Sequence, residues 1–101
     1  MVVVRNVFRL KFGKAREAIG YWKEGRSFME KQKFGKGPIR ILTDVAGSNF
    51  YTLVLENTFD SLADYEQSEA RVLRNDEWRS RYQKFVPLVE SGHREIFKVV
   101  E

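Results

Sequence analysis

The stretch that decides the fold runs from Asn75 to Val100 and has the sequence NDEWRSRYQKFVPLVESGHREIFKVV. Its first part places apolar residues at the spacing of one helix face, namely Trp78, Tyr82, Phe85, Val86 and Val89. Ser91-Gly92 is typical of a helix end, and residues 93–100 then have the composition of a β-strand. We therefore expect the chain to close with a short amphipathic helix that leads into a last strand.

A strand is also predicted at the other end of the chain, over residues 2–12. Because successive side chains of a strand point to opposite faces, these residues fall into two sets. One face carries Val2, Val4, Asn6, Phe8, Leu10 and Phe12, and the other carries Val3, Arg5, Val7, Arg9 and Lys11. The first face is the more apolar, so we expect it to be buried.

The segment after this strand predicts a helix. Gly13-Lys14 breaks the alternation, and apolar residues then recur at helical spacing over residues 14–33. Arg26 falls inside the same apolar stripe. The glycine-rich segment 35–38 is expected to end the helix and turn the chain.

Next come a predicted hairpin and a second helix. Residues 39–45 and 50–59 alternate as strands do, and the turn residues at 46–49 lie between them. Asp60-Ser61 is a candidate N-cap for a helix. Asn75-Asp76 is a second candidate cap, which predicts a break in that helix before Trp78.

The predicted order is β-α-β-β-α-β, which is typical of the ferredoxin-like fold. We expect an α+β sandwich over residues 1–101 as a single domain, with a four-stranded antiparallel sheet and helices on one face. Both faces of the sheet carry apolar residues, for example Val7 on one face and Phe8 on the other. A sheet that is apolar on both faces needs two covers, so self-association is expected.

The composition excludes several classes of protein. The chain has no cysteine, so it forms neither disulfides nor sites in which cysteine binds zinc or an iron–sulfur cluster. It has one histidine and no acidic cluster with ligand spacing, so we expect no metal and no cofactor. The 18 Lys and Arg and the 14 Asp and Glu residues are interleaved, and the net charge of +4 forms no one-sign stripe. Nucleic acid is therefore not an expected partner.

The N-terminal residues give no sign of a targeting segment. The apolar run at 1–4 is far shorter than a signal peptide or a membrane span requires, and Arg5 follows it at once. We expect a cytoplasmic protein without a membrane partner.

With this element order, the chain resembles the dimeric α+β barrel superfamily, and within it the NIPSNAP-like and antibiotic-biosynthesis-monooxygenase-like groups. The segments that carry the resemblance are the helix start Asp76-Glu77-Trp78 and the end from Val86 to Val99. The resemblance implies a homodimer formed through the sheet face and a pocket between the helices and the sheet. It also implies a NIPSNAP-like protein that binds a small apolar or aromatic ligand in this pocket.

Two enzymatic alternatives follow from the same resemblance, so whether the chain is an enzyme stays open. The monooxygenases of the superfamily act on aromatic or polyketide-like substrates without metal or flavin. A haem-degrading branch resembles them and uses a strand Asn, a helix Trp and a helix His. Asn6 and Trp78 match the first two, but the only histidine, His93, follows the last helix, so this alternative is disfavoured. A third alternative is a domain whose aromatic residues only fill its core.

The candidate ligand-binding residues are Asn6, Trp22, Arg26, Trp78 and Tyr82. Asn6 is a carboxamide on an apolar strand face, so it either holds a ligand oxygen or is satisfied within the protein. The two tryptophans and Tyr82 either stack on a planar ligand or fill the core.

Arg26 and His93 are the candidates for a catalytic role. Arg26 could bind a carboxylate or an enolate, or its stem could pack while its head reaches solvent or a glutamate such as Glu56 or Glu95. His93 is the one side chain with an ordinary pKa near neutrality, which suits a general base. A histidine beside Ser91-Gly92 is also typical of a solvated turn.

Overall fold

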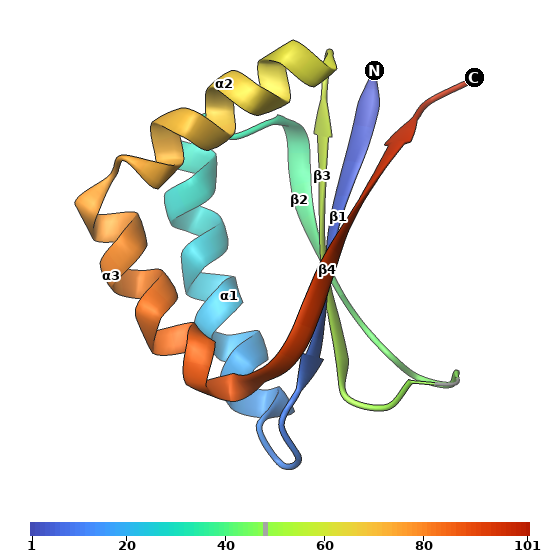
Figure 1. Ribbon diagram of the computed structural model, residues 1–101, viewed down its shortest axis with the longest axis vertical. Coiled ribbons are helices and arrows are strands. Elements are labelled where there is room, and N and C mark those ends of the chain that lie inside the picture. Colours follow the sequence, from blue (N-terminus) through green and yellow to red (C-terminus); the bar gives the residue numbers. More distant parts are fainter. Residues whose placement is uncertain (48) are drawn as a thin grey trace.

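The computed structural model describes residues 1–47 and 49–101. In chain order, the elements are β1 (Val2–Leu10), α1 (Ala15–Lys31), β2 (Lys36–Thr43), β3 (Thr52–Phe59), α2 (Leu62–Leu73), α3 (Asp76–Phe85), the short 3₁₀ helix η1 (Val86–Leu88) and β4 (Val89–Lys98). The strands form one antiparallel sheet in the order β2-β3-β1-β4. Figure 1 shows the three α-helices together on one face of this sheet. The predicted α+β ferredoxin-like architecture is confirmed.

The last strand is longer than the sequence predicts. β4 begins at Val89 and not at His93, so Ser91 and Gly92 lie inside the strand and do not end a helix. Gly92 pairs with Phe8 of β1. This pairing is a long-range contact, and it overrides the local tendency of a Ser-Gly pair to end regular structure.

Other boundaries also move by a few residues. β1 ends at Leu10, and Phe12, which we expected on the buried face, is 82% exposed because the chain has already left the sheet. β2 begins at Lys36, so most of the predicted turn at 35–38 belongs to a strand. The predicted turn at 46–49 includes Ser48, which lies outside the described residues.

The helix caps agree with the sequence. Ser61 Oγ accepts a hydrogen bond from the backbone N–H of Asp64 at the start of α2. Asn75 Oδ1 accepts one from the backbone N–H of Trp78, so α3 starts as a separate helix, as the predicted break requires.

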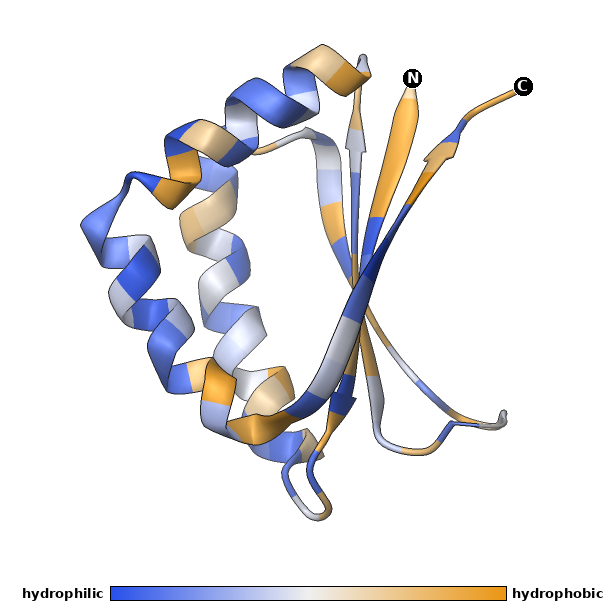
Figure 2. Ribbon diagram, in the orientation of Figure 1, coloured by the Kyte–Doolittle hydropathy of each residue, from blue (hydrophilic) through white to orange (hydrophobic). Residues whose placement is uncertain are grey.

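The main core lies between the helices and the sheet, and Phe85 is at its centre. This side chain is fully buried, and its ring packs edge-on against Phe8 at 5.0 Å and Trp22 at 5.2 Å between ring centroids. A smaller cluster joins Tyr65 of α2 to Val4 and Phe59 of the sheet. Figure 2 shows apolar residues along the strands and along the helix segments that meet them. This packing fixes the distance between the two layers.

The other face of the sheet has a mixed surface. Val7 of β1 pairs with Val54 of β3 on this face. The neighbouring pair, Asn6 and Leu55, points to the opposite face, under the helices. Arg5 contacts Glu56 at 3.5 Å on the same face as Val7. In the described part of the chain, no helix lies on this face (Figure 1).

Candidate functional site

A cavity of about 600 Å³ lies between the helix layer and the sheet. Side chains from α1, α2, α3 and all four strands line it. Arg94 of β4 and Glu69 of α2 are partly solvent-exposed, with 47% and 29% of their side-chain surfaces accessible, and mark its mouth. Its volume falls within the range of about 300–1,000 Å³ that is usual for small-molecule sites.

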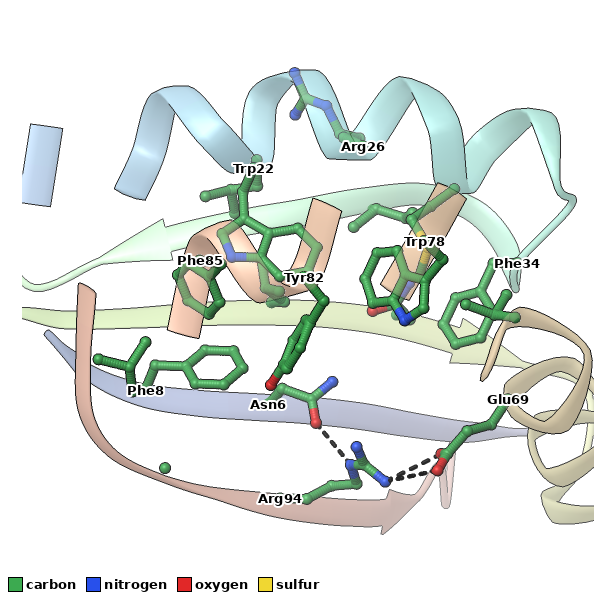
Figure 3. Close-up of a pocket in the computed structure, with 18 of the residues that line it drawn as sticks. Asn6, Phe8, Trp22, Arg26, Phe34, Glu69, Trp78, Tyr82, Phe85 and Arg94 are labelled. Atoms are coloured by element: carbon green, nitrogen blue, oxygen red, sulfur yellow. Dashed lines mark hydrogen bonds and ion pairs between the residues drawn. The ribbon is translucent and has the colours of Figure 1, made fainter. Parts of the chain in front are cut away.

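One wall of the cavity is aromatic. Trp22 comes from α1, and Trp78 and Tyr82 come from α3, where a spacing of four residues puts both on the inward face. The ring centroids of Trp22 and Trp78 are 5.6 Å apart, and those of Trp78 and Tyr82 are 5.7 Å apart. The structure thus brings three of the predicted ligand-binding residues together around one cavity (Figure 3).

Asn6 lies on the opposite wall, in the middle of β1. Its Oδ1 accepts a hydrogen bond of 2.6 Å from Arg94 Nε. Arg94 Nη1 also donates to both carboxylate oxygens of Glu69, at 3.0 and 3.2 Å. The Arg94 guanidinium lies 5.8 Å from the centre of the Tyr65 ring. Figure 3 shows this polar chain running from the floor of the cavity to α2.

Three buried polar atoms of the cavity wall have no hydrogen-bond partner among the described residues. They are Trp22 Nε1, Asn57 Nδ2 and Tyr65 Oη. Asn57 is only 5% exposed. An unpaired buried polar group costs about 1–3 kcal/mol of stability. These three atoms have almost no accessible surface, so they lie behind the surface of the cavity and out of reach of a ligand in it.

Three polar residues of this site were not predicted from the sequence: Arg94, Glu69 and Asn57. Asn57 could have been found by the argument used for Asn6, because it is a polar residue on the same strand face as Leu55 and Phe59. Arg94 and Glu69 are 25 positions apart, and no local pattern connects them.

Arg26 does not direct its guanidinium into the cavity. Its Nε lies 3.9 Å from Glu30 one turn along α1, and Figure 3 shows the head group pointing away from the other labelled residues. Of the two alternatives for Arg26, the structure shows the one with the head group at the surface, but not with Glu56 or Glu95 as its partner. Both of those carboxylates contact Arg5 on the outer face of the sheet, out of reach of α1.

His93 also lies apart from the polar chain. His93 is a lining residue because β4 forms part of the cavity wall. It pairs with Val7, so its side chain lies on the outer face of the sheet. There its Nε2 is 3.6 Å from Glu95 Oε2. The imidazole is well exposed there. The structure therefore does not bring the two catalytic candidates together.

Two features are absent from the described residues. None of the helices found there is long and apolar enough to span a membrane. Over 1–47 and 49–101, no group of three His, Asp or Glu side chains has the proximity that metal binding requires.

The fold and the cavity define a class: α+β proteins of ferredoxin-like topology with an apolar pocket between helices and sheet. The model of the NIPSNAP family matches residues 4–101. The chain belongs to the NIPSNAP family.

Solved structures share the fold of this chain. An uncharacterized NIPSNAP domain protein from Burkholderia xenovorans superimposes with a TM-score of 0.84 and 16% identity, over 99% of this chain and 95% of that one. A NIPSNAP family protein of unknown function from Agrobacterium tumefaciens gives 0.83 and 24%, over 98% and 87%. An antibiotic biosynthesis monooxygenase gives 0.75 and 9%, over the whole of both chains. At these identities the likeness establishes the fold alone. Among curated proteins, none matches the chain.

Proposed function

We propose that this protein binds a small, mainly apolar or aromatic ligand in the cavity between its helices and its sheet. The observation that carries the proposal is the cavity itself. It has the volume of a small-molecule site, an aromatic wall and a polar residue, Asn6, on the opposite wall. Trp22, Trp78, Tyr82 and Asn6 are the residues that contact the ligand, whereas the Arg26 head group does not.

The experiment is an isothermal calorimetric titration of the protein with a planar aromatic probe, 2-acetylnaphthalene. Val86 is half-exposed and lines the cavity, so Val86→Phe places a ring there without disturbing the core. Val45→Phe is the matched control, because Val45 is 99% exposed and is not a lining residue. We expect binding to the wild type, weaker binding to the first variant and unchanged binding to the second. Absence of binding, or equal binding to all three proteins, contradicts the proposal.

We also propose that two copies of the chain pack together through the outer sheet face. Val7, Val54 and Leu42 are apolar and at least half-buried on this face, and Phe97 is a large, half-exposed residue at its edge. The charges among them are paired within the chain, as Arg5 with Glu56 is, so a second copy would meet few unpaired charges.

Native mass spectrometry of the purified protein tests the dimer. The wild type is expected as a dimer, and Val7→Glu as a monomer, because the substitution buries a charge in the interface. Val45→Glu adds the same charge at an exposed position and leaves the dimer intact. A monomeric wild type refutes the dimer.

A second candidate function is a monooxygenase that needs no cofactor. It is favoured by one observation: Asn6 and Trp78 line the same cavity in a fold shared with an antibiotic biosynthesis monooxygenase. Oxygen uptake with an electron-rich quinol substrate tests it. Asn6→Ala should retain the fold and lose turnover, and a variant as active as the wild type refutes this site. We do not extend the proposal to haem degradation, because the single imidazole lies on the outer face and not in the cavity.

A further inference from the structure

We propose that this cavity selects planar ligands carrying an uncharged acceptor oxygen, such as a ketone carbonyl, and that Asn6 Nδ2 donates the hydrogen bond to that oxygen. Arg94 and Glu69 are the positioning residues that hold Asn6 in the donating orientation. The inference rests on the proposed ligand-binding function and adds the chemical class of the ligand.

The orientation of the Asn6 amide follows from its partner. The oxygen and nitrogen of an asparagine side chain have nearly the same shape, so hydrogen bonds decide which is which. Arg94 Nε, 2.6 Å away, can only donate. The Asn6 atom that faces it must therefore be the oxygen. The NH₂ group is left on the other side, and Figure 3 shows it directed into the cavity, on the side of Tyr82.

A second contact keeps this orientation in place. The Glu69 carboxylate accepts two hydrogen bonds from Arg94 Nη1, and the Tyr65 ring lies under the guanidinium. Arg94 is thus held from α2 while it holds Asn6 on β1. Rotating the amide by half a turn would place NH₂ against the guanidinium, where two donors meet and no acceptor is present. The donor that faces the ligand is therefore fixed before the ligand arrives.

The charges around the mouth favour a neutral ligand over an anion. Arg94 is neutralised by Glu69 at 3.0 Å. The guanidinium of Arg26 lies near Glu30 and points away from the cavity. A carboxylate on the ligand would therefore lose its hydration and find no free cation inside the described part of the site.

The experiment compares three probes of similar size: 2-acetylnaphthalene, 2-ethylnaphthalene and 2-naphthoate. One neutral hydrogen bond is worth about 0.5–1.5 kcal/mol, so the ketone should bind about three- to tenfold more tightly than the hydrocarbon. The naphthoate should bind no more tightly than the ketone. In ¹⁵N NMR spectra, the assigned side-chain amide of Asn6 should shift with the ketone and not with 2-ethylnaphthalene. This readout needs no variant.

Three variants separate the effect of the Asn6 donor from the effect of charge. Asn6→Asp keeps the acceptor for Arg94 and removes the donor, so the ketone should lose its advantage while 2-ethylnaphthalene binds as before. Asn6→Leu is the second variant if the aspartate prevents folding, and the same loss is expected. Glu69→Gln leaves Arg94 without its carboxylate, so the naphthoate should gain affinity relative to the ketone.

The outcomes distinguish this inference from the proposal on which it rests. Equal affinity for all three probes, or an advantage of the ketone that survives Asn6→Asp, refutes the inference and leaves ligand binding standing. If no probe binds at all, ligand binding itself is refuted, and the inference with it.

Discussion

Gly92 lies directly opposite Phe8 in the pairing of β4 with β1, and a Cβ atom at position 92 would lie 3.0 Å from a carbon of the Phe8 ring. The added atom would also lie 3.3 Å from the backbone oxygen of Val7, which cannot withdraw as a side chain can. The glycine is therefore needed for close packing inside a strand. This relationship connects the closing strand to the centre of the core and to the cavity, which Phe8, Phe85 and Gly92 all line.

Gly92→Ala should lower the free energy of unfolding by about 1–2 kcal/mol, because an added methyl group forces strain on a packed core. Gly20→Ala is the matched control. A Cβ at position 20 of α1 meets nothing within 4 Å, and alanine favours a helix by about 1 kcal/mol, so this variant should be more stable than the wild type. Urea denaturation measures both effects. Equal changes in the two variants would show that strand packing is not the cause.

The pairing of Phe8 with Gly92 shows which parts of the sheet could be predicted from the sequence and which could not. Alternation in β1 was enough to put Asn6 and Phe8 on the buried face, because a strand that is apolar on one face has only one favourable orientation. The start of β4 was misplaced, since Ser91-Gly92 has the local signal of a helix end. Its register opposite β1 depends on contacts across more than 80 positions of the chain.

The aromatic wall was predictable and the polar wall was not. Trp78 and Tyr82 follow helical spacing, which is a local property. The link from Asn6 through Arg94 to Glu69 joins three elements that are distant in sequence, and interleaved charges give no hint of which pair will meet. Arg26 shows the same limit: both ligand binding and a head group at the surface were predicted for it, and its Glu30 neighbour was not among the glutamates named as partners.

The break between α2 and α3 depends on one side chain. Asn75 Oδ1 accepts the hydrogen bond of the Trp78 backbone N–H at the start of α3, the helix that supplies two of the three residues of the aromatic wall. Asn75→Ala should cost about 1 kcal/mol of stability, whereas Asn75→Asp should cost little because it keeps an acceptor. Thermal unfolding gives the comparison. If the aspartate is as damaging as the alanine, the cap does not act through its acceptor oxygen.

The end of α1 stores backbone strain at Lys33. The backbone N–H of Phe34 donates to Met29 O and that of Lys33 donates to Glu30 O, which is the Schellman arrangement, with Lys33 at φ 54° in the position that favours glycine. A left-handed conformation costs a residue other than glycine about 1–2 kcal/mol. Glycine avoids this cost but loses more conformational entropy when the chain folds. Lys33→Gly should therefore stabilise the protein by about 0.5–1 kcal/mol. Lys23→Gly, in the middle of α1, should destabilise by about 1 kcal/mol. Denaturation midpoints that move in the same direction for both variants would contradict this explanation.

Tyr21 should make stability fall at alkaline pH. Burial raises the pKa of its hydroxyl from 10.0 to about 12, against the lowering effect of the Arg81 charge. A pKa that is higher in the folded than in the unfolded state means that folding favours the neutral phenol. The resulting stabilisation is fully present below pH 10 and is lost as the pH rises through about 12.

Tyr21→Phe isolates this effect. The phenylalanine keeps the ring that stacks on Phe85 and removes a buried hydroxyl that has no partner among the described residues, so stability at pH 7 should be equal or slightly higher. Between pH 10 and pH 12, the wild type should lose stability more steeply than the variant. The two proteins differ only by this hydroxyl, so every other contribution to the pH dependence of stability cancels in the difference. Unfolding midpoints measured across this range give the test, and parallel curves for the two proteins would show that Tyr21 does not titrate as its burial requires.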